Sequence, residues 1–381
     1  LLLFCVLISC KNEKSSNTYS YNLKASEIIK SFVLDSDVKY NAFYLYTFSD
    51  DKGKEYLTFL NYRTNQILFY DLETTDFLFK LNLNSEGPHG VVQPTGLYVK
   101  DLNHIYVSSY VYSGLMRVDT TCHIIQKIPY GITSKGYNVL PSYTPSSHPY
   151  IAPVIIDKKI YITQNAIDRF HPIVDTPLSV VIDTVQKSCE DLPLTYGILT
   201  EKELAIKDPR FSRVFNGKEF IYSFYVSEDI VVTSVDHSEV KKISVKSKYL
   251  DSPIVKQEVS ERGPQLNLEL ARYGDLIYDP YREVYYRFVY PKTTLEDNIR
   301  WWGKSVYGRK KFSVIILNKD FQIIGETLFP ESIYNSYVFF VHKDGLYISR
   351  DYQMIYGQSE DYMTFELFNS VSYTHLRAHE T

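Results

Sequence analysis

The fold is decided by the stretch PVIIDKKIYI at residues 153–162. It joins an apolar strand, a short polar turn at Asp157-Lys158 and a second strand that carries Tyr161. A tyrosine in a matching setting returns at steps of 50 to 63 residues, at Tyr56, Tyr106, Tyr161, Tyr222, Tyr285 and Tyr347. The chain therefore contains six repeats, and a repeat of this length is the first feature that a fold assignment must explain.

Each repeat contains two further strands. The third strand ends in Asp or Asn, whose side chain can accept hydrogen bonds from backbone amides further on and so opens a tight turn. These corner residues are Asp71, Asp119, Asp183, Asp236 and Asn318. A fourth strand follows the corner, as in residues 76–81 and 124–128. Four antiparallel strands in each of six repeats predict an all-β fold, a six-bladed β-propeller that forms a single domain over residues 21–370.

The last repeat lacks an outer strand after residues 362–367. Residues 26–34 are predicted to supply this strand and so to close the ring. A two-sheet sandwich is the competing all-β fold, but it requires no period of four strands. The composition agrees with sheet structure, because the 35 tyrosines and 21 phenylalanines suit a pleated, half-buried surface. The formal net charge of −4 argues against a nucleic-acid partner, which would require a basic surface.

The first ten residues indicate export. Residues 1–9 form an apolar run that is too short to span a bilayer and is typical of a signal peptide. Leu7-Ile8-Ser9-Cys10 resembles the lipobox of bacterial lipoproteins, which implies that the Cys10 thiol is lipidated and becomes the mature N-terminus. Polar residues 10–20 are predicted to be a flexible tether. We therefore expect an outer membrane lipoprotein, on the periplasmic or the cell-surface side, whose membrane contact is the lipid anchor at Cys10.

The last residues, 371–381, resemble the translation of a sequencing adapter and are set aside from any site. Of the four cysteines, Cys5 and Cys10 belong to the export signal. The repeat places Cys122 and Cys189 near the outer rims of neighbouring blades. That separation exceeds the Cα distance of about 4.4–6.8 Å that a disulfide requires, so two separate thiols are expected.

Two further stretches precede blades, SEGPHG at residues 85–90 and the similar ERGP at residues 261–264. Together with the lipobox and the repeat, they resemble the six-bladed β-propeller lipoproteins of Bacteroidota, and are most similar to the family of unknown function numbered 4221. The resemblance covers most of residues 21–369. It implies a fold and a location in the cell envelope, and it implies no known activity.

The long connections of the predicted propeller all fall on one face. If the strands of a blade are lettered a to d from the axis outward, the d–a and b–c connections share a face. The long segments occupy only these positions: residues 131–149, 192–209 and 251–270 in d–a links, and residues 165–177 and 291–310 in b–c loops. Long loops in compact domains are frequently functional, so the sequence predicts a site on this long-loop face.

Two clusters in these loops are candidate ligand-binding residues. The first contains Arg300, Trp301 and Trp302 beside Tyr290, because tryptophan faces stack on sugars and arginine bonds hydroxyls or acidic sugars. The competing interpretation is that the tryptophans plug the top of the core. The second cluster is Asp168 together with Arg169, Phe170 and His171, a candidate anion-binding or acid–base group. Its competing interpretation is a loop salt bridge with a chance histidine beside it.

Catalytic motifs are absent from the sequence, which has no His-Glu-x-x-His, no Gly-x-Ser-x-Gly and no phosphate loop. No cofactor and no metal site are predicted. The leading hypothesis is a non-enzymatic binding or interaction propeller for a glycan or an envelope protein. The alternative is a carbohydrate-active enzyme, a lyase or a glycosidase, in the propeller funnel. Its candidate residues are Asp275, Asp279, Arg282 and Arg287.

Overall fold

The structure is a computed structural model. It describes residues 21–35, 38, 43–61, 64–109, 111–133, 136, 150–164, 173–256, 268–295, 308–351 and 361–372. Strands dominate this part of the chain. Helical segments are short, among them α1 (Glu201–Leu204) and two 3-10 turns, at Ile173–Asp175 and Tyr196–Ile198. Thr200 caps α1 by accepting a hydrogen bond from the backbone N–H of Glu203. No helix among the described residues is long and apolar enough to cross a membrane.

Four separate sheets each contain four consecutive antiparallel strands. The first contains β2 (Phe43–Ser49), β3 (Glu55–Asn61), β4 (Gln66–Asp71) and β5 (Phe77–Asn82). The second contains β6 (Pro94–Asp101), β7 (His104–Ser109), β8 (Gly114–Val118) and β9 (Ile124–Pro129). The third contains β10 (Val154–Ile156), β11 (Lys159–Thr163), β12 (Ser179–Asp183) and β13 (Ser188–Asp191). The fourth contains β14 (Phe211–Phe215), β15 (Phe220–Phe224), β16 (Asp229–Thr233) and β17 (Val240–Ser244).

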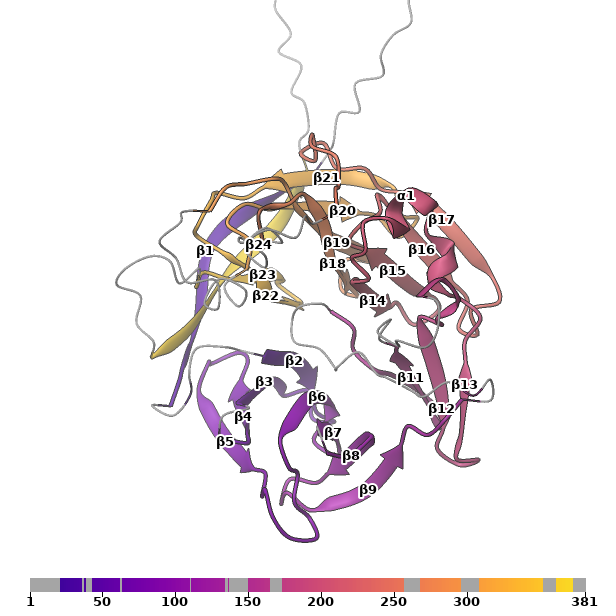
Figure 1. Cartoon of the computed structure of the whole chain (residues 1–381). Helices are drawn as coiled ribbons and strands as arrows, with labels where there is room; N and C mark the ends of the chain where they lie inside the picture. Colours follow the sequence, from indigo (N-terminus) through magenta and orange to yellow (C-terminus); the bar gives the residue numbers. More distant parts are fainter. Residues whose placement is uncertain are drawn as a thin grey trace, which may run out of the picture.

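The fifth sheet has eight strands and joins the two ends of the described chain. One half contains β18 (Arg272–Asp279), β19 (Val284–Tyr290), β20 (Ser313–Leu317) and β21 (Ile323–Leu328). The other half contains β22 (Asn335–His342), β23 (Gly345–Ser349), β24 (Tyr362–Ser372) and β1 (Tyr21–Val33). The sheets surround a central axis as the blades of a propeller do, with β2, β6, β14, β18 and β22 innermost (Figure 1).

The expectation of six separate sheets is corrected by this topology, which contains four four-stranded sheets and one eight-stranded sheet. The two halves of the large sheet are joined where Tyr21 of β1 pairs in parallel with Gly325 of β21. The join depends on glycine, because a Cβ at position 325 would overlap the carbonyl group of Tyr21. The structure agrees with the repeat in that it forms a ring of four-stranded antiparallel units. One of these units is completed by the N-terminal strand β1.

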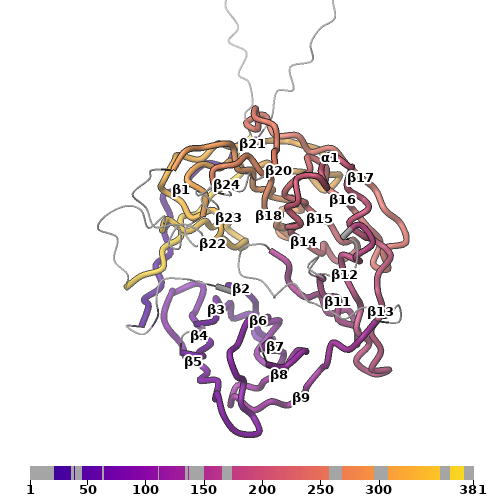
Figure 2. Tube along the Cα trace, viewed as in Figure 1, coloured from indigo at the N-terminus to yellow at the C-terminus, as the bar shows by residue number. Residues whose placement is uncertain are grey.

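The predicted closing strand is confirmed. β1 pairs antiparallel with β24 from Tyr21 opposite Ser372 to Val33 opposite Tyr362, with an irregularity between Ala25 and Ile29. Figure 2 shows these strands, from opposite ends of the described chain, next to each other. Phe32 of β1 is fully buried, and its ring lies 5.6 Å from that of Tyr70 in the first sheet and 6.0 Å from that of Phe365 in β24.

The repeated tyrosines occupy equivalent places. All six lie on the second strand of a four-strand unit and are at most 7% exposed. Several of their hydroxyls bond the polar turn that precedes such a strand. The Tyr56 hydroxyl donates to Asp50 over 3.0 Å, and Asn216 donates to the Tyr285 hydroxyl of the neighbouring unit over 2.8 Å. The repeated tyrosines therefore bond these turns either within a unit, as at Tyr56, or across to the neighbouring unit, as at Tyr285. Cys122 and Cys189 are separate free thiols, as predicted.

Candidate functional site

A cavity of about 550 Å³ lies at the centre of the ring. Its wall combines the innermost strands β2, β6, β10, β14 and β18, so five units contribute to one space. The contributing residues lie near the ends of these strands, just before the short turns into the second strands, as at Lys100, Asn216 and Pro280. The cavity therefore lies at the end of the ring opposite the long d–a and b–c connections.

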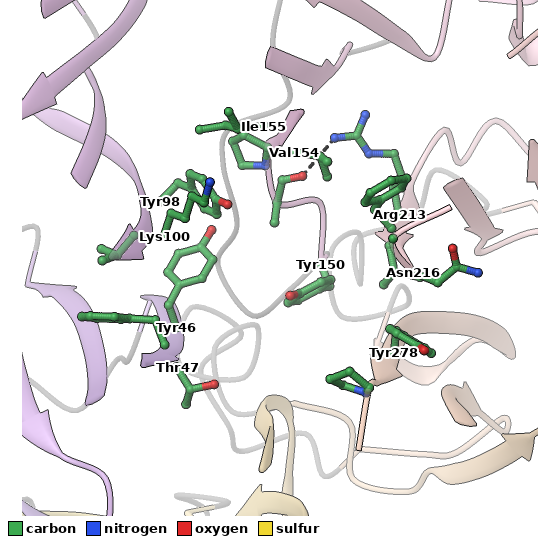
Figure 3. Close-up of a pocket in the computed structure, with 18 residues that line it drawn as sticks. Tyr46, Thr47, Tyr98, Lys100, Tyr150, Val154, Ile155, Arg213, Asn216 and Tyr278 are labelled. Atoms are coloured by element: carbon green, nitrogen blue, oxygen red, sulfur yellow. Dashed lines mark hydrogen bonds between the residues drawn. The ribbon is translucent and has the colours of Figure 1, made fainter. Parts of the chain in front are cut away.

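Tyrosines from different units face this space. Tyr46 of β2, Tyr98 of β6, Tyr278 of β18 and Tyr150, just before β10, all line the cavity (Figure 3). The Tyr46 and Tyr98 rings meet edge to face with their centroids 5.6 Å apart. Burial raises the pKa of the Tyr98 and Tyr150 hydroxyls, so both stay protonated and can donate hydrogen bonds. The wall therefore offers flat apolar ring surface together with hydroxyl groups.

Tyr150 is held in place by its backbone. Its N–H donates to the Asp275 carboxylate of β18 over 2.9 Å, and its carbonyl accepts from the backbone N–H of Arg213 of β14 over 2.7 Å. β10 itself has only three residues, so the segment that precedes it replaces the beginning of an inner strand. The backbone ties to two other units fix the Tyr150 ring within the cavity wall.

A second polar feature of the wall is Arg213, which is 1% exposed. Its Nη1 donates to the Ser179 hydroxyl over 2.8 Å, and its Nη2 donates to the carbonyls of Ala152 and Tyr161 over 2.9 Å each. Burial lowers the pKa of the guanidinium, but arginine remains charged in proteins. Tyr161 is one of the repeated tyrosines, so the arginine is anchored on the third sheet as well as on its own strand.

Residues 20–328 match the family described as "Domain of unknown function (DUF4221)". The chain belongs to the DUF4221 family. A DUF4221 member from Bacteroides vulgatus ATCC 8482, whose crystal structure was determined at 1.75 Å, is similar with a TM-score of 0.80 and 27% identity, over 93% of this chain and 99% of that chain.

A protein of Bacteroides fragilis NCTC 9343 is similar in fold alone, with a TM-score of 0.55 and 9% identity over 92% of this chain and 95% of that one. No curated protein matches the chain. Membership of the DUF4221 family therefore supports the fold and assigns no activity to the chain.

Most of the predicted ligand-binding residues of this DUF4221 protein lie outside the described residues, namely Arg300, Trp301, Trp302, Arg169, Phe170 and His171. They remain predictions. Tyr290 ends β19 on the long-loop side of the ring and is 1% exposed. The Arg309 guanidinium lies 5.1 Å from its ring centroid, and Gly274 leaves the room that the ring occupies. Tyr290 thus packs at the base of the loop that carries the tryptophans.

The residues proposed for an enzymatic site do not converge in the DUF4221 structure. Asp279 accepts hydrogen bonds from the Arg282 guanidinium and from the Tyr281 N–H of its own turn, each over 3.0 Å. Asp275 accepts from the Tyr225 hydroxyl over 2.8 Å. Arg287 donates to the Ser223 hydroxyl and to backbone carbonyls of residues 227 and 228. The described wall of the cavity contains no carboxylate, so it lacks the acid and base pair of a glycosidase.

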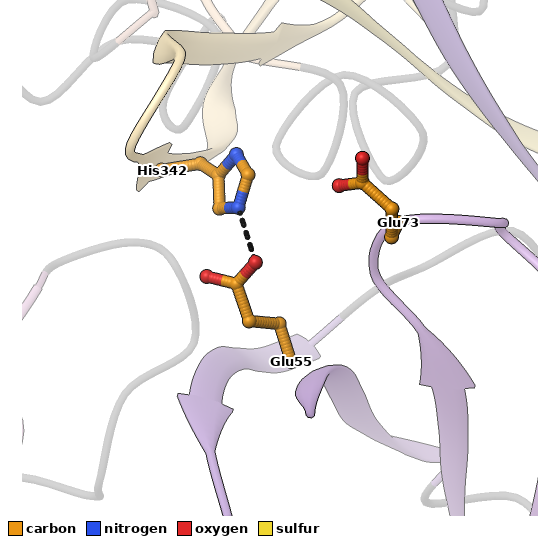
Figure 4. Close-up of side chains that lie close together, drawn as sticks. All are labelled: Glu55, Glu73 and His342. Atoms are coloured by element: carbon orange, nitrogen blue, oxygen red, sulfur yellow. Dashed lines mark hydrogen bonds and ion pairs between the residues drawn. The ribbon is translucent and has the colours of Figure 1, made fainter. Parts of the chain in front are cut away.

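One cluster has the residue types of a metal site. Glu55, Glu73 and His342 place one ligand atom each within 4.8 Å of one another (Figure 4). His342 contacts Glu55 through Nε2 over 2.9 Å and Asp344 through Nδ1 over 3.0 Å. The Lys343 ammonium lies 2.9 Å from the same Glu55 oxygen and occupies the place of a cation. Burial acts to raise the pKa of Glu55, but hydrogen bonds from His342 and Lys343 outweigh it and hold that pKa below its ordinary value.

This cluster joins the last unit to the first, since His342 ends β22 and Glu55 begins β3. We therefore interpret it as an ion-pair link in the ring. Long loops alone did not identify the cavity residues. The available signal was the aromatic residue shortly before several of the inner turns, as at Tyr98 and Tyr278.

Proposed function

We propose that this DUF4221 protein is an envelope-anchored binding protein that holds a small polyhydroxylated ligand, such as part of a glycan, in its central cavity. The observation that carries the proposal is the cavity wall, which combines tyrosines from four units with no carboxylate among its described residues. Aromatic faces stack on the apolar faces of sugars while phenol hydroxyls bond their hydroxyl groups. A wall of this kind favours binding over acid–base catalysis.

The propeller supports binding because it already holds the tyrosine side chains of the wall in place, so that they need not rearrange when a ligand binds. The wall residues belong to inner strands that are hydrogen-bonded within their sheets, and Tyr150 is tied to β14 and β18. A preformed site loses less side-chain entropy when a ligand binds. For this purpose the eight-stranded sheet acts as two blades, since a single residue pair joins its halves. The binding protein is then a six-bladed propeller.

The anchor completes the proposal. Cys10 carries the lipid, residues 10–20 tether the propeller, and the protein faces the periplasm or the cell surface from the outer membrane. The predicted long-loop face, to which the sequence assigns Arg300, Trp301 and Trp302, is then a second contact surface, for an envelope protein. No cofactor is required for either contact.

The test is thermal unfolding of the full chain, with Cys10→Ser to prevent lipidation, against a panel of mono- and oligosaccharides. A ligand that binds only the native state stabilises it by about 2.7 kcal/mol at a hundred times its Kd. We expect Tyr278→Ala to weaken binding about tenfold or more, because Tyr278 lines the cavity. Tyr281→Ala is the matched control, since Tyr281 is 53% exposed in the adjacent turn and is not part of the wall.

Two outcomes would contradict the proposal. If no saccharide raises the unfolding midpoint, the cavity does not bind sugars. If a saccharide is shortened during incubation and the shortening is lost on Tyr278→Ala, the carbohydrate-active enzyme becomes the better description.

A further inference from the structure

We infer that the central cavity selects an anionic ligand, a sugar that carries a carboxylate or a phosphate, through the charges of Arg213 and Lys100. The inference rests on the proposed function and adds the chemical class of its ligand. Both cations belong to the cavity wall, Arg213 on β14 and Lys100 on β6. No described wall residue carries a negative charge to balance them.

Of the two cations, Arg213 gives the stronger evidence for an anionic ligand. Its guanidinium donates to one hydroxyl and two backbone carbonyls and lies 4.9 Å from the Phe220 ring centroid, and no ion pair joins it to a described carboxylate. Its Nε is buried without a hydrogen-bond partner among the described residues. A buried charge is costly unless a counter-charge compensates it. The fold therefore maintains an uncompensated positive charge in the wall of a cavity.

A chain of hydroxyl groups explains how this charge is held. The Ser179 hydroxyl that accepts from Arg213 lies 2.8 Å from the Tyr222 hydroxyl, which lies 2.5 Å from Nε2 of His237. Nδ1 of His237 faces the Val235 carbonyl at 3.2 Å, so it carries the proton and Nε2 accepts. Arg213, Ser179, Tyr222 and His237 can then each donate a hydrogen bond to the next group along the chain, in the direction that leads away from the arginine. The chain supplies oriented dipoles and leaves the net charge at plus one.

Arg287 shows what a purely structural arginine looks like in this protein. It is also fully buried, but its Nε, Nη1 and Nη2 all donate to the Ser223 hydroxyl or to backbone carbonyls. It lies on the second strand of its unit and does not line the cavity. Arg213 differs in both respects, because its Nε is unpartnered and its strand forms the wall.

The carboxylates nearest in sequence to the wall bond other groups. Asp279, between the wall residues Tyr278 and Pro280, pairs with the Arg282 guanidinium over 3.0 Å. Asp50 accepts from the N–H groups of Lys52 and Lys54, and Asp101 accepts from the Asn103 N–H and contacts the His104 ring. Such carboxylates bond the turns that contain them. They leave Lys100, whose side chain is exposed, as the charged group at the edge of the cavity.

The experiment measures binding of glucuronate, glucose 6-phosphate and glucose to the full chain carrying Cys10→Ser, by titration calorimetry at low and high salt. We expect the two anions to bind about tenfold or more tightly than glucose, because a hydrogen bond to a charged group is stronger than one to a neutral group. The preference should weaken as salt is added. Lys100→Met should reduce the affinity for the anions about tenfold, and should reduce the affinity for glucose by much less.

Lys158→Met is the matched control, because Lys158 is exposed in the turn of the next unit and does not line the cavity. Arg213→Met removes the second charge, and Lys100→Met keeps the inference testable if that variant fails to fold. Equal affinity for glucose and both anions would overturn the inference and leave the proposed function standing. If none of the three ligands binds, and no other saccharide binds either, both the inference and the proposed function are overturned.

Discussion

His237 lies in the turn between β16 and β17, is 1% exposed, and ends the hydroxyl chain that begins at Arg213. Burial, and then the nearby charge of Arg213, lower the pKa of its imidazole to about 4 from the ordinary 6.5. The unfolded chain therefore binds the proton more readily than the folded chain. The stability that neutral His237 contributes is complete above about pH 6.5 and is lost as the pH falls towards 4.

We expect the loss to be about 3 kcal/mol, since each unit of pKa difference corresponds to about 1.4 kcal/mol. Urea unfolding between pH 7.5 and 4.5 measures it, and His237→Gln should remove most of the dependence within this window. His123→Gln is the control, because that side chain is 59% exposed. An unchanged pH dependence in the His237 variant would show that the buried imidazole does not control acid stability.

Gly325 decides how two elements meet. β1 can approach β21 at this position only because no side chain intervenes, and the neighbouring Leu23 N–H then donates to the Thr327 hydroxyl over 2.7 Å. Gly325→Ala should separate the two halves of the eight-stranded sheet at this point. Overpacking of a close contact costs about 1–3 kcal/mol. Urea unfolding measures this loss, and hydrogen exchange should show reduced protection of the Leu23 amide.

Gly197→Ala is the control for this substitution. Its added Cβ would meet the Thr195 hydroxyl at 3.2 Å, a contact that a small shift of the side chain relieves. If Gly325→Ala kept both its stability and the protection of Leu23, the join between β1 and β21 would not depend on the missing side chain.

The whole molecule depends on closure of the ring, because the last unit is completed by residues more than three hundred positions away in the sequence. Removal of residues 1–34 would leave one edge of β24 unpaired, since only β23 would remain beside it, and would open the core around Phe32. A sheet edge exposed in this way is prone to pairing with other chains. We expect this truncated chain to aggregate or to unfold without cooperativity.

Size-exclusion chromatography and circular dichroism give the readout. A chain that lacks only residues 1–18 should fold normally, and a synthetic peptide of residues 19–35 should restore cooperative unfolding to the longer truncation. If the chain without residues 1–34 remained monomeric and equally stable, the N-terminal strand would be an accessory to the ring.

The strands, their grouping in fours and the corners between them were predictable from the sequence. The corner residues Asp71, Asp119 and Asp183 each accept an amide hydrogen bond from a residue two positions on, as predicted. These features are predictable because alternation along a strand and the bonding of an Asp side chain to its own turn are local interactions. The closing strand was also predictable, since one unit lacked a strand and one apolar segment was left over.

The join at Gly325 and the cavity were not predictable and are seen only in the folded chain. The cavity lies at the end of the ring opposite the predicted long-loop face. Its wall takes Tyr98, Tyr150, Arg213 and Tyr278 from four different units, and nothing in the spacing of these residues marks them as neighbours. The uncompensated charge of Arg213 depends on which side chains pack around it. Such contacts depend on how the units are arranged about the axis, and a local pattern carries no information about that arrangement.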